Sequence, residues 1–167
     1  MSASHVPRYA SFGIVALLLL TLAGASSAQA QEIQTFPGSS CQASGSAQDL
    51  YYSGVSVANR NGSTSSAVCP LVRANGTADW LAIAVFVRDR HATQNISCVA
   101  QARDPSGVAG SGWSETQSTA GEGDQVLVFG VPGEALPPYG PYVVTCSLPA
   151  MVNNLPSYIS SIVLVEP

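Results

Sequence analysis

The sequence contains no lysine, and charged side chains make up only 10% of its 167 residues. Proteins bind nucleic acids and anionic membrane surfaces through clustered lysine and arginine side chains. Residues 31–167 keep all ten acidic residues and five of the six arginines, which gives this part a formal net charge of −5. We therefore expect neither a nucleic-acid partner nor an anionic membrane partner.

Histidine is nearly absent too, since His91 is the only one after residue 30. Serine and cysteine nucleophiles usually need a histidine base beside them and an acid that orients it. His91 lies in a short polar segment that reads as an exposed turn, and no serine occupies a strand–turn–helix elbow. We expect no catalytic residues, and a small secreted hydrolase is the least favoured function.

The sequence also lacks an apolar run long enough to span a bilayer, which takes roughly 20 helical residues. The run from residue 12 to residue 23 is shorter, follows the single cation Arg8, and precedes an Ala28-Gln29-Ala30 cleavage pattern. These features predict a signal peptide over residues 1–30 and one domain over residues 31–167. We expect a secreted or periplasmic protein with no membrane span after cleavage of the signal.

Four cysteines are present, Cys41, Cys69, Cys98 and Cys146, and an even number in an exported chain favours disulfides. No pair has the close spacing of a zinc site, so we expect no metal and no other cofactor. Three pairings are possible. Alternation places Cys98 and Cys146 on the apolar faces of their strands, which favours a Cys98–Cys146 bridge and leaves Cys41–Cys69 by elimination.

The remaining pattern is apolar–polar alternation interrupted by Gly, Ser, Asn and Pro, without a helical apolar stripe. It predicts an all-β antiparallel sandwich, Ig-like or jelly-roll-like, of about 7–9 strands. The candidate strands are residues 53–59, 67–71, 80–88, 95–103, 125–131, 142–148 and 158–165, with a weaker one over 113–119.

Two candidate strands stand out for their apolar content. The segment 80–88 is apolar on both faces, which predicts a central strand, either an interior strand of a well-packed sandwich or one with a side covered by a partner. The segment 159–165 ends close to the last residue, and it could pair within its own sheet or add as an edge to another subunit's sheet.

Three functions remain open, and the leading one is an exported, non-enzymatic structural or interaction domain. The alternative is a carbohydrate-binding module that uses the aromatic rings of Trp113, Tyr51 and Tyr52. The acidic residues Glu115, Glu122 and Asp124 fall in turn-like segments, where solvated charges are a better interpretation than a glycosidase pair or a calcium site. The expected partner is thus a protein or a glycan.

Short motifs around the cysteines resemble a family of small secreted bacterial proteins. They comprise a Cys-Pro-apolar-x-Arg element at residues 69–73, Val87-Arg88-Asp89, Ser97-Cys98, and a Cys-x-Leu-Pro element at residues 146–149 before a last strand with Ser157, Ile159 and Val165-Glu166. The resemblance covers most of residues 41–166. It implies an exported, disulfide-linked β domain and transfers no catalytic residues.

Overall fold

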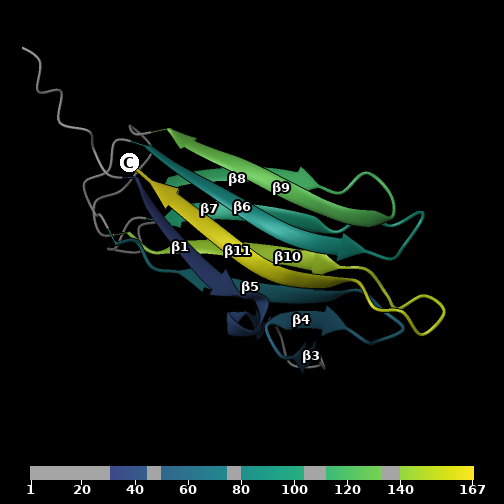
Figure 1. Ribbon diagram of the computed structural model, residues 1–167. Coiled ribbons are helices and arrows are strands. Elements are labelled where there is room, and N and C mark those ends of the chain that lie inside the picture. The colour runs from purple at the N-terminus through teal and green to yellow at the C-terminus, as the bar shows by residue number, and fades with distance from the viewer. Residues whose placement is uncertain (1–30, 45–49, 75–79, 104–111, 133–139) are drawn as a thin grey trace, which may run out of the picture. The chain divides into compact units, whose positions relative to one another are not determined.

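The computed structural model describes residues 31–44, 50–74, 80–103, 112–132 and 140–167 (Figure 1). The predicted signal peptide, residues 1–30, lies outside this part. Eleven strands are present in the described residues: β1 (Glu32–Pro37), β2 (Gln42–Ala43), β3 (Leu50–Ser53), β4 (Ser56–Asn59), β5 (Ser65–Leu71), β6 (Trp80–Asp89), β7 (Ser97–Arg103), β8 (Gly112–Ser118), β9 (Gly123–Pro132), β10 (Tyr142–Leu148) and β11 (Tyr158–Glu166). A short 3-10 helix, Gly38–Ser40, follows β1.

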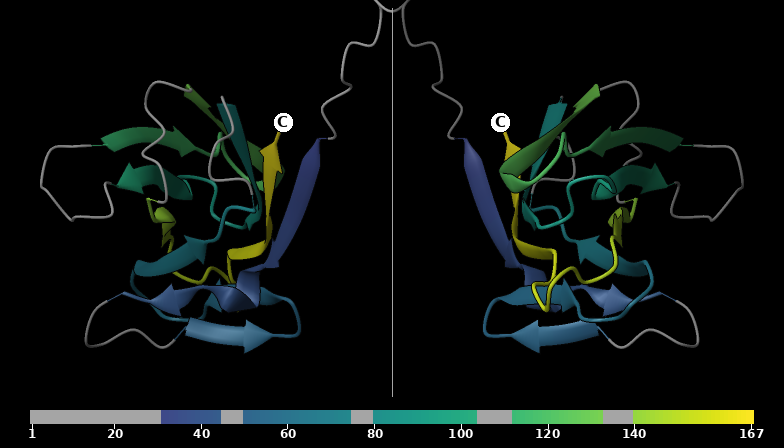
Figure 2. Two further views of the ribbon diagram at one scale, coloured as in Figure 1. Left: turned by 90° about the vertical axis from the view of Figure 1, so that its left-hand side faces the viewer. Right: turned by 90° about the vertical axis from the view of Figure 1, so that its right-hand side faces the viewer.

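The strands form two antiparallel sheets that stack face to face (Figure 2). Sheet A has the order β3-β4-β11-β6-β9, and β1 also pairs with β11. Sheet B has the order β2-β5-β10-β7-β8. The predicted all-β sandwich is confirmed, but the expected count of 7–9 strands is too low because β1, β2 and β3 were not predicted.

Alternation explains why the eight candidate strands form where they do. In β6, Leu81, Ile83, Val85 and Val87 point into the core and are at most 3% exposed. Facing residues from sheet B, such as Val144 on β10, are equally buried. Each such side chain contributes about 1.5–3 kcal/mol on burial, so the layer between the sheets supplies the main stabilisation.

Both predicted disulfides are confirmed. Cys98 and Cys146 lie directly opposite each other on β7 and β10, and Cys41 is joined to Cys69 on β5. In the chain-entropy description, closing loops of 28 and 48 residues stabilises the fold by about 4 kcal/mol each. Two disulfides are consistent with an extracellular protein. Within the described segments, no helix is long and apolar enough to cross a membrane.

The last strand occupies the middle of sheet A and is not an edge. β11 pairs with β6 on one side and with β1 and β4 on the other (Figure 1). Its end is fixed by a buried ion pair between Arg73 and Glu166, and the backbone N–H of Ala74 donates to the same carboxylate at 2.9 Å. The suggestion that this strand adds to another subunit's sheet is therefore wrong, since its own sheet uses both of its edges.

Candidate functional site

The outer face of sheet A carries an unusual number of exposed apolar side chains. Residues of β6 and β9 that alternate with the core residues point outward here, and Phe86, Val126 and Val128 are 38%, 47% and 56% exposed. The apolar second face that the sequence shows in β6 is thus open to solvent. β6 is an interior strand of the sandwich, as expected, because it lies between β11 and β9, and within the described residues no segment packs over its outer face.

Strand register brings these side chains into rows across the sheet. Phe86 on β6 lies opposite Val126 on β9 and Ser161 on β11. One row further along, Arg88 lies between Asp124 and Tyr158. The face therefore changes from aliphatic to aromatic and polar along the strands, and the change occurs at Phe86.

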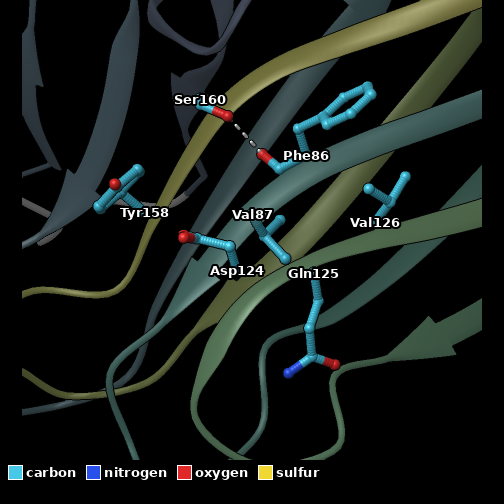
Figure 3. Close-up of a pocket in the computed structure, with 7 residues that line it drawn as sticks. All are labelled: Phe86, Val87, Asp124, Gln125, Val126, Tyr158 and Ser160. Carbon is cyan, nitrogen blue, oxygen red and sulfur yellow. Dashed lines mark hydrogen bonds between the residues drawn. The ribbon is translucent and has the colours of Figure 1, made fainter.

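A pocket of about 360 Å³ opens at this change (Figure 3). Three strands that are distant in the sequence supply its lining, namely β6, β9 and β11. The lining residues are Phe86, Val87, Asp124, Gln125, Val126, Tyr158 and Ser160. Its volume lies within the range of small-molecule sites, about 300–1,000 Å³.

Some polar groups of the pocket already have hydrogen-bond or ion-pair partners within the protein, and others are open to solvent. Arg88 Nη1 and Asp124 Oδ2 form an ion pair at 2.5 Å, and Ser160 Oγ donates to the carbonyl of Phe86 at 3.0 Å. The amide of Gln125 is held by the turn at residues 120–121. The Asp124 carboxylate remains 69% exposed as a side chain, and the Tyr158 hydroxyl bonds to no other described residue. The pocket thus combines two rings with hydroxyl and carboxylate groups and no net charge.

The three aromatic residues proposed from the sequence lie elsewhere and do not meet. Tyr51 and Tyr52 are 39% and 45% exposed on β3, at one edge of sheet A. The Arg60 guanidinium lies 3.3 Å from the centroid of the Tyr51 ring. Trp113 is on β8, the edge of sheet B beside β9, and is half-buried against the core. These residues cannot form one continuous site, because they lie on opposite edges of the sandwich.

His91 lies in the connection between β6 and β7, where its ring serves the local turn. The backbone N–H of Gln94 donates to His91 Nδ1 at 3.0 Å. Asp89 accepts from the backbone N–H of His91, and its two oxygens also accept from Ile96, Thr119 and Ser157. The Asp89 carboxylate therefore accepts hydrogen bonds from the backbone of the connection between β6 and β7. His91 and Asp89 together hold this connection in place.

The acidic residues considered in the sequence are dispersed. Glu115 lies in β8, where it accepts a hydrogen bond from Gln117, whereas Glu122 is exposed in the turn between β8 and β9. Asp124 alone lines the pocket. In the part of the chain that the structure describes, no three His, Cys, Asp or Glu side chains are grouped to hold a metal ion.

Sequence reasoning missed Phe86 and Tyr158, although both fall within candidate strands, 80–88 and 158–165. A signal was available, since Phe86 precedes Arg88 by two positions in β6. Two positions along a strand keep both side chains on the same face. Tyr158 carries no comparable signal, because only the pairing of β11 with β6 brings it to the pocket.

No protein-family model and no curated protein match this chain. Solved structures with a similar architecture include the xylan-binding module CBM15, with 14% identity, a TM-score of 0.49, and coverage of 82% of this chain and 97% of that one. The CBM6cm-2 module from Cellvibrio mixtus lichenase 5A in complex with cellotriose has 11% identity, a TM-score of 0.44, and coverage of 78% and 95%. The CBM36-1 domain of a xylanase from the hindgut metagenome of Trinervitermes trinervoides has 9% identity, a TM-score of 0.43, and coverage of 80% and 96%. Similarity at this level of identity does not identify a ligand for this chain. A ligand is inferred from the side chains on its own surface.

Proposed function

We propose that this protein is a non-catalytic binding module for a neutral glycan, with the pocket between β6, β9 and β11 as its site. One observation carries the proposal: Phe86 and Tyr158 present ring surface beside the Asp124 carboxylate and the Ser160 hydroxyl in an open pocket. A sugar ring has apolar C–H faces and a rim of hydroxyls, so it matches rings flanked by hydrogen-bonding groups.

The charge of the site supports a neutral ligand. Asp124 is balanced by its ion pair with Arg88, and the pocket has no other charged lining residue. An anionic ligand would meet a protein of net negative charge. Of the three functions that the sequence left open, glycan binding is the one that this combination of groups favours.

A glycan array followed by titration calorimetry tests the proposal. We expect the protein to bind at least one neutral glycan, and Phe86→Ala and Tyr158→Ala to weaken that binding about fivefold or more, since truncating a central contact residue costs above about 1 kcal/mol. Tyr52→Ala is the matched control, because it removes an exposed ring from the distant edge strand β3. Absence of any bound glycan, or equal loss in all three variants, would contradict the proposal.

A further inference from the structure

The pocket opens onto an aliphatic strip along the outer face of sheet A. The strip consists of two outward side chains from each of three neighbouring strands, and Val126 belongs to both strip and pocket. Its members are Ala82, Ala84, Val126, Val128, Val163 and Val165. None of the six carries a charge or a hydrogen-bonding group.

This composition excludes a longer sugar chain as the occupant of the strip. Each hydroxyl laid against aliphatic side chains would lose its water without gaining a partner. The backbone groups of β6 and β11 are paired with neighbouring strands on both sides, and those on the free edge of β9 point sideways in the plane of the sheet rather than up from its face. A polysaccharide would therefore leave the surface where the pocket ends.

The size of the strip argues against a second copy of the chain. Ile33 on β1, which is 62% exposed and lies opposite Val165, extends this apolar face to a fourth strand. Four strands about 4.8 Å apart and about 13 Å of strand length define an apolar area of roughly 250 Å² with side-chain width included. A specific protein–protein interface buries about 800 Å² on each partner, so the apolar face is about a third of what a stable dimer needs.

We infer that the ligand is a sugar that bears an alkyl or acyl chain, with the sugar in the pocket and the chain along the aliphatic strip. The inference rests on the proposed glycan function and adds the chemical class of the ligand. A carbon–carbon bond of about 1.5 Å advances an extended chain by about 1.3 Å per methylene, so about ten carbons cover the strip. Such a chain matches an uncharged surface that has no hydrogen-bonding side chains.

Chain-length dependence of affinity is the direct test. Methyl, hexyl and octyl β-D-glucosides are titrated into the full protein below their micelle-forming concentrations, with sodium octanesulfonate as a chain that lacks a sugar. A methylene that is half-buried on a flat face adds about a twofold gain in affinity. We expect octyl glucoside to bind about fourfold more tightly than hexyl glucoside, and octanesulfonate to bind far more weakly.

A matched pair of variants assigns the effect to the strip. Val128→Asp places a charge within the strip at a residue that is 56% exposed, so the fold tolerates it and the dependence on chain length is lost. Val55→Asp makes the same change at a 65% exposed residue between β3 and β4 and keeps the dependence. The methyl glucoside binds both variants equally.

Four outcomes overturn the inference, and they separate it from the proposed function. Equal affinity for methyl and octyl glucosides means that the alkyl chain does not bind along the strip, while glycan binding in the pocket stands. If octanesulfonate binds as tightly as octyl glucoside, the sugar contributes nothing to binding, and the proposed glycan function is wrong as well. If sedimentation shows concentration-dependent dimers and Val128→Asp abolishes them, the strip binds a second copy of the chain. Equal chain-length dependence in both variants places the chain elsewhere.

Discussion

At the scale of single residues, a buried acid organises the connection between β6 and β7. Asp89 is 1% exposed, yet both of its oxygens are saturated. Oδ1 accepts from the backbone N–H of His91 and the hydroxyl of Ser157, whereas Oδ2 accepts from Ile96 and Thr119. Four donors replace the water that the carboxylate loses on burial, which is why it can stay inside.

We predict that Asp89→Asn lowers the free energy of unfolding by about 2 kcal/mol or more. The amide keeps one acceptor oxygen and turns an N–H₂ group toward two donors, so hydrogen bonds to a charged acceptor worth about 1.5–3 kcal/mol are lost. Urea unfolding measures the change. Asp124→Asn is the control, because its exposed pair with Arg88 contributes about 0–1 kcal/mol. Similar effects of the two substitutions would contradict this account of Asp89.

A second residue links stability to alkaline pH. Burial raises the pKa of Tyr142 above its ordinary value of 10.0, although Arg73, which donates to the phenol oxygen at 3.2 Å, lowers it in part. An unfolded tyrosine ionises near pH 10, while the folded Tyr142 still holds its proton. This difference contributes stability that is complete below pH 10 and is lost as the pH rises through the folded value.

We therefore predict that the free energy of unfolding falls above pH 10 and that Tyr142→Phe makes this fall shallower. Chemical denaturation at pH 8, 9, 10 and 11 measures the slope, which is independent of any constant loss caused by removal of the hydroxyl. Tyr52→Phe, at an exposed edge position, is the control and should leave the slope unchanged. An unaltered alkaline slope in Tyr142→Phe would assign the loss to other groups.

At the scale of strands, the success of sequence reasoning follows from how each strand is buried. β10 was predicted at the bounds that the structure gives, because its residues alternate strictly between buried and half-buried positions. β1 was missed because Ile33 points to solvent while Phe36 packs against the core, so its apolar residues do not share a face. Short edge strands bury too little of either face to leave a period in the sequence.

The disulfides and the pocket show that sequence reasoning predicts local features of a strand but not the register between strands. Cys98 and Cys146 could be paired from sequence because both follow the inward phase of well-formed strands, and phase is a local property. The pocket depends on the register among β6, β9 and β11, which is set by pairs of residues up to 83 positions apart in the chain, such as Ala82 and Val165. No local pattern reports such a register.

At the scale of the whole molecule, sheet A depends on its last strand. β1 and β4 reach β6 only through β11, so removal of β11 leaves β3–β4, β1 and β6–β9 as separate pieces. The same strand supplies Ile159, Ile162 and Leu164 to the core, all 0% exposed. The fold can therefore close only after the end of the chain has joined it, which makes folding depend on contacts distant in sequence.

We predict that truncation after Pro156 abolishes cooperative unfolding and with it the binding pocket, which loses Tyr158 and Ser160. Loss of three fully buried aliphatic side chains alone exceeds about 5 kcal/mol, comparable to the net stability of a small domain. Near-ultraviolet circular dichroism and thermal unfolding measure the outcome. Glu166→Gln is the control, because it weakens the buried pair with Arg73 but keeps the strand, and it should lower the melting temperature without loss of cooperativity. A truncated chain that still unfolds cooperatively would mean that sheet B and the β6–β9 pair form a domain without β11.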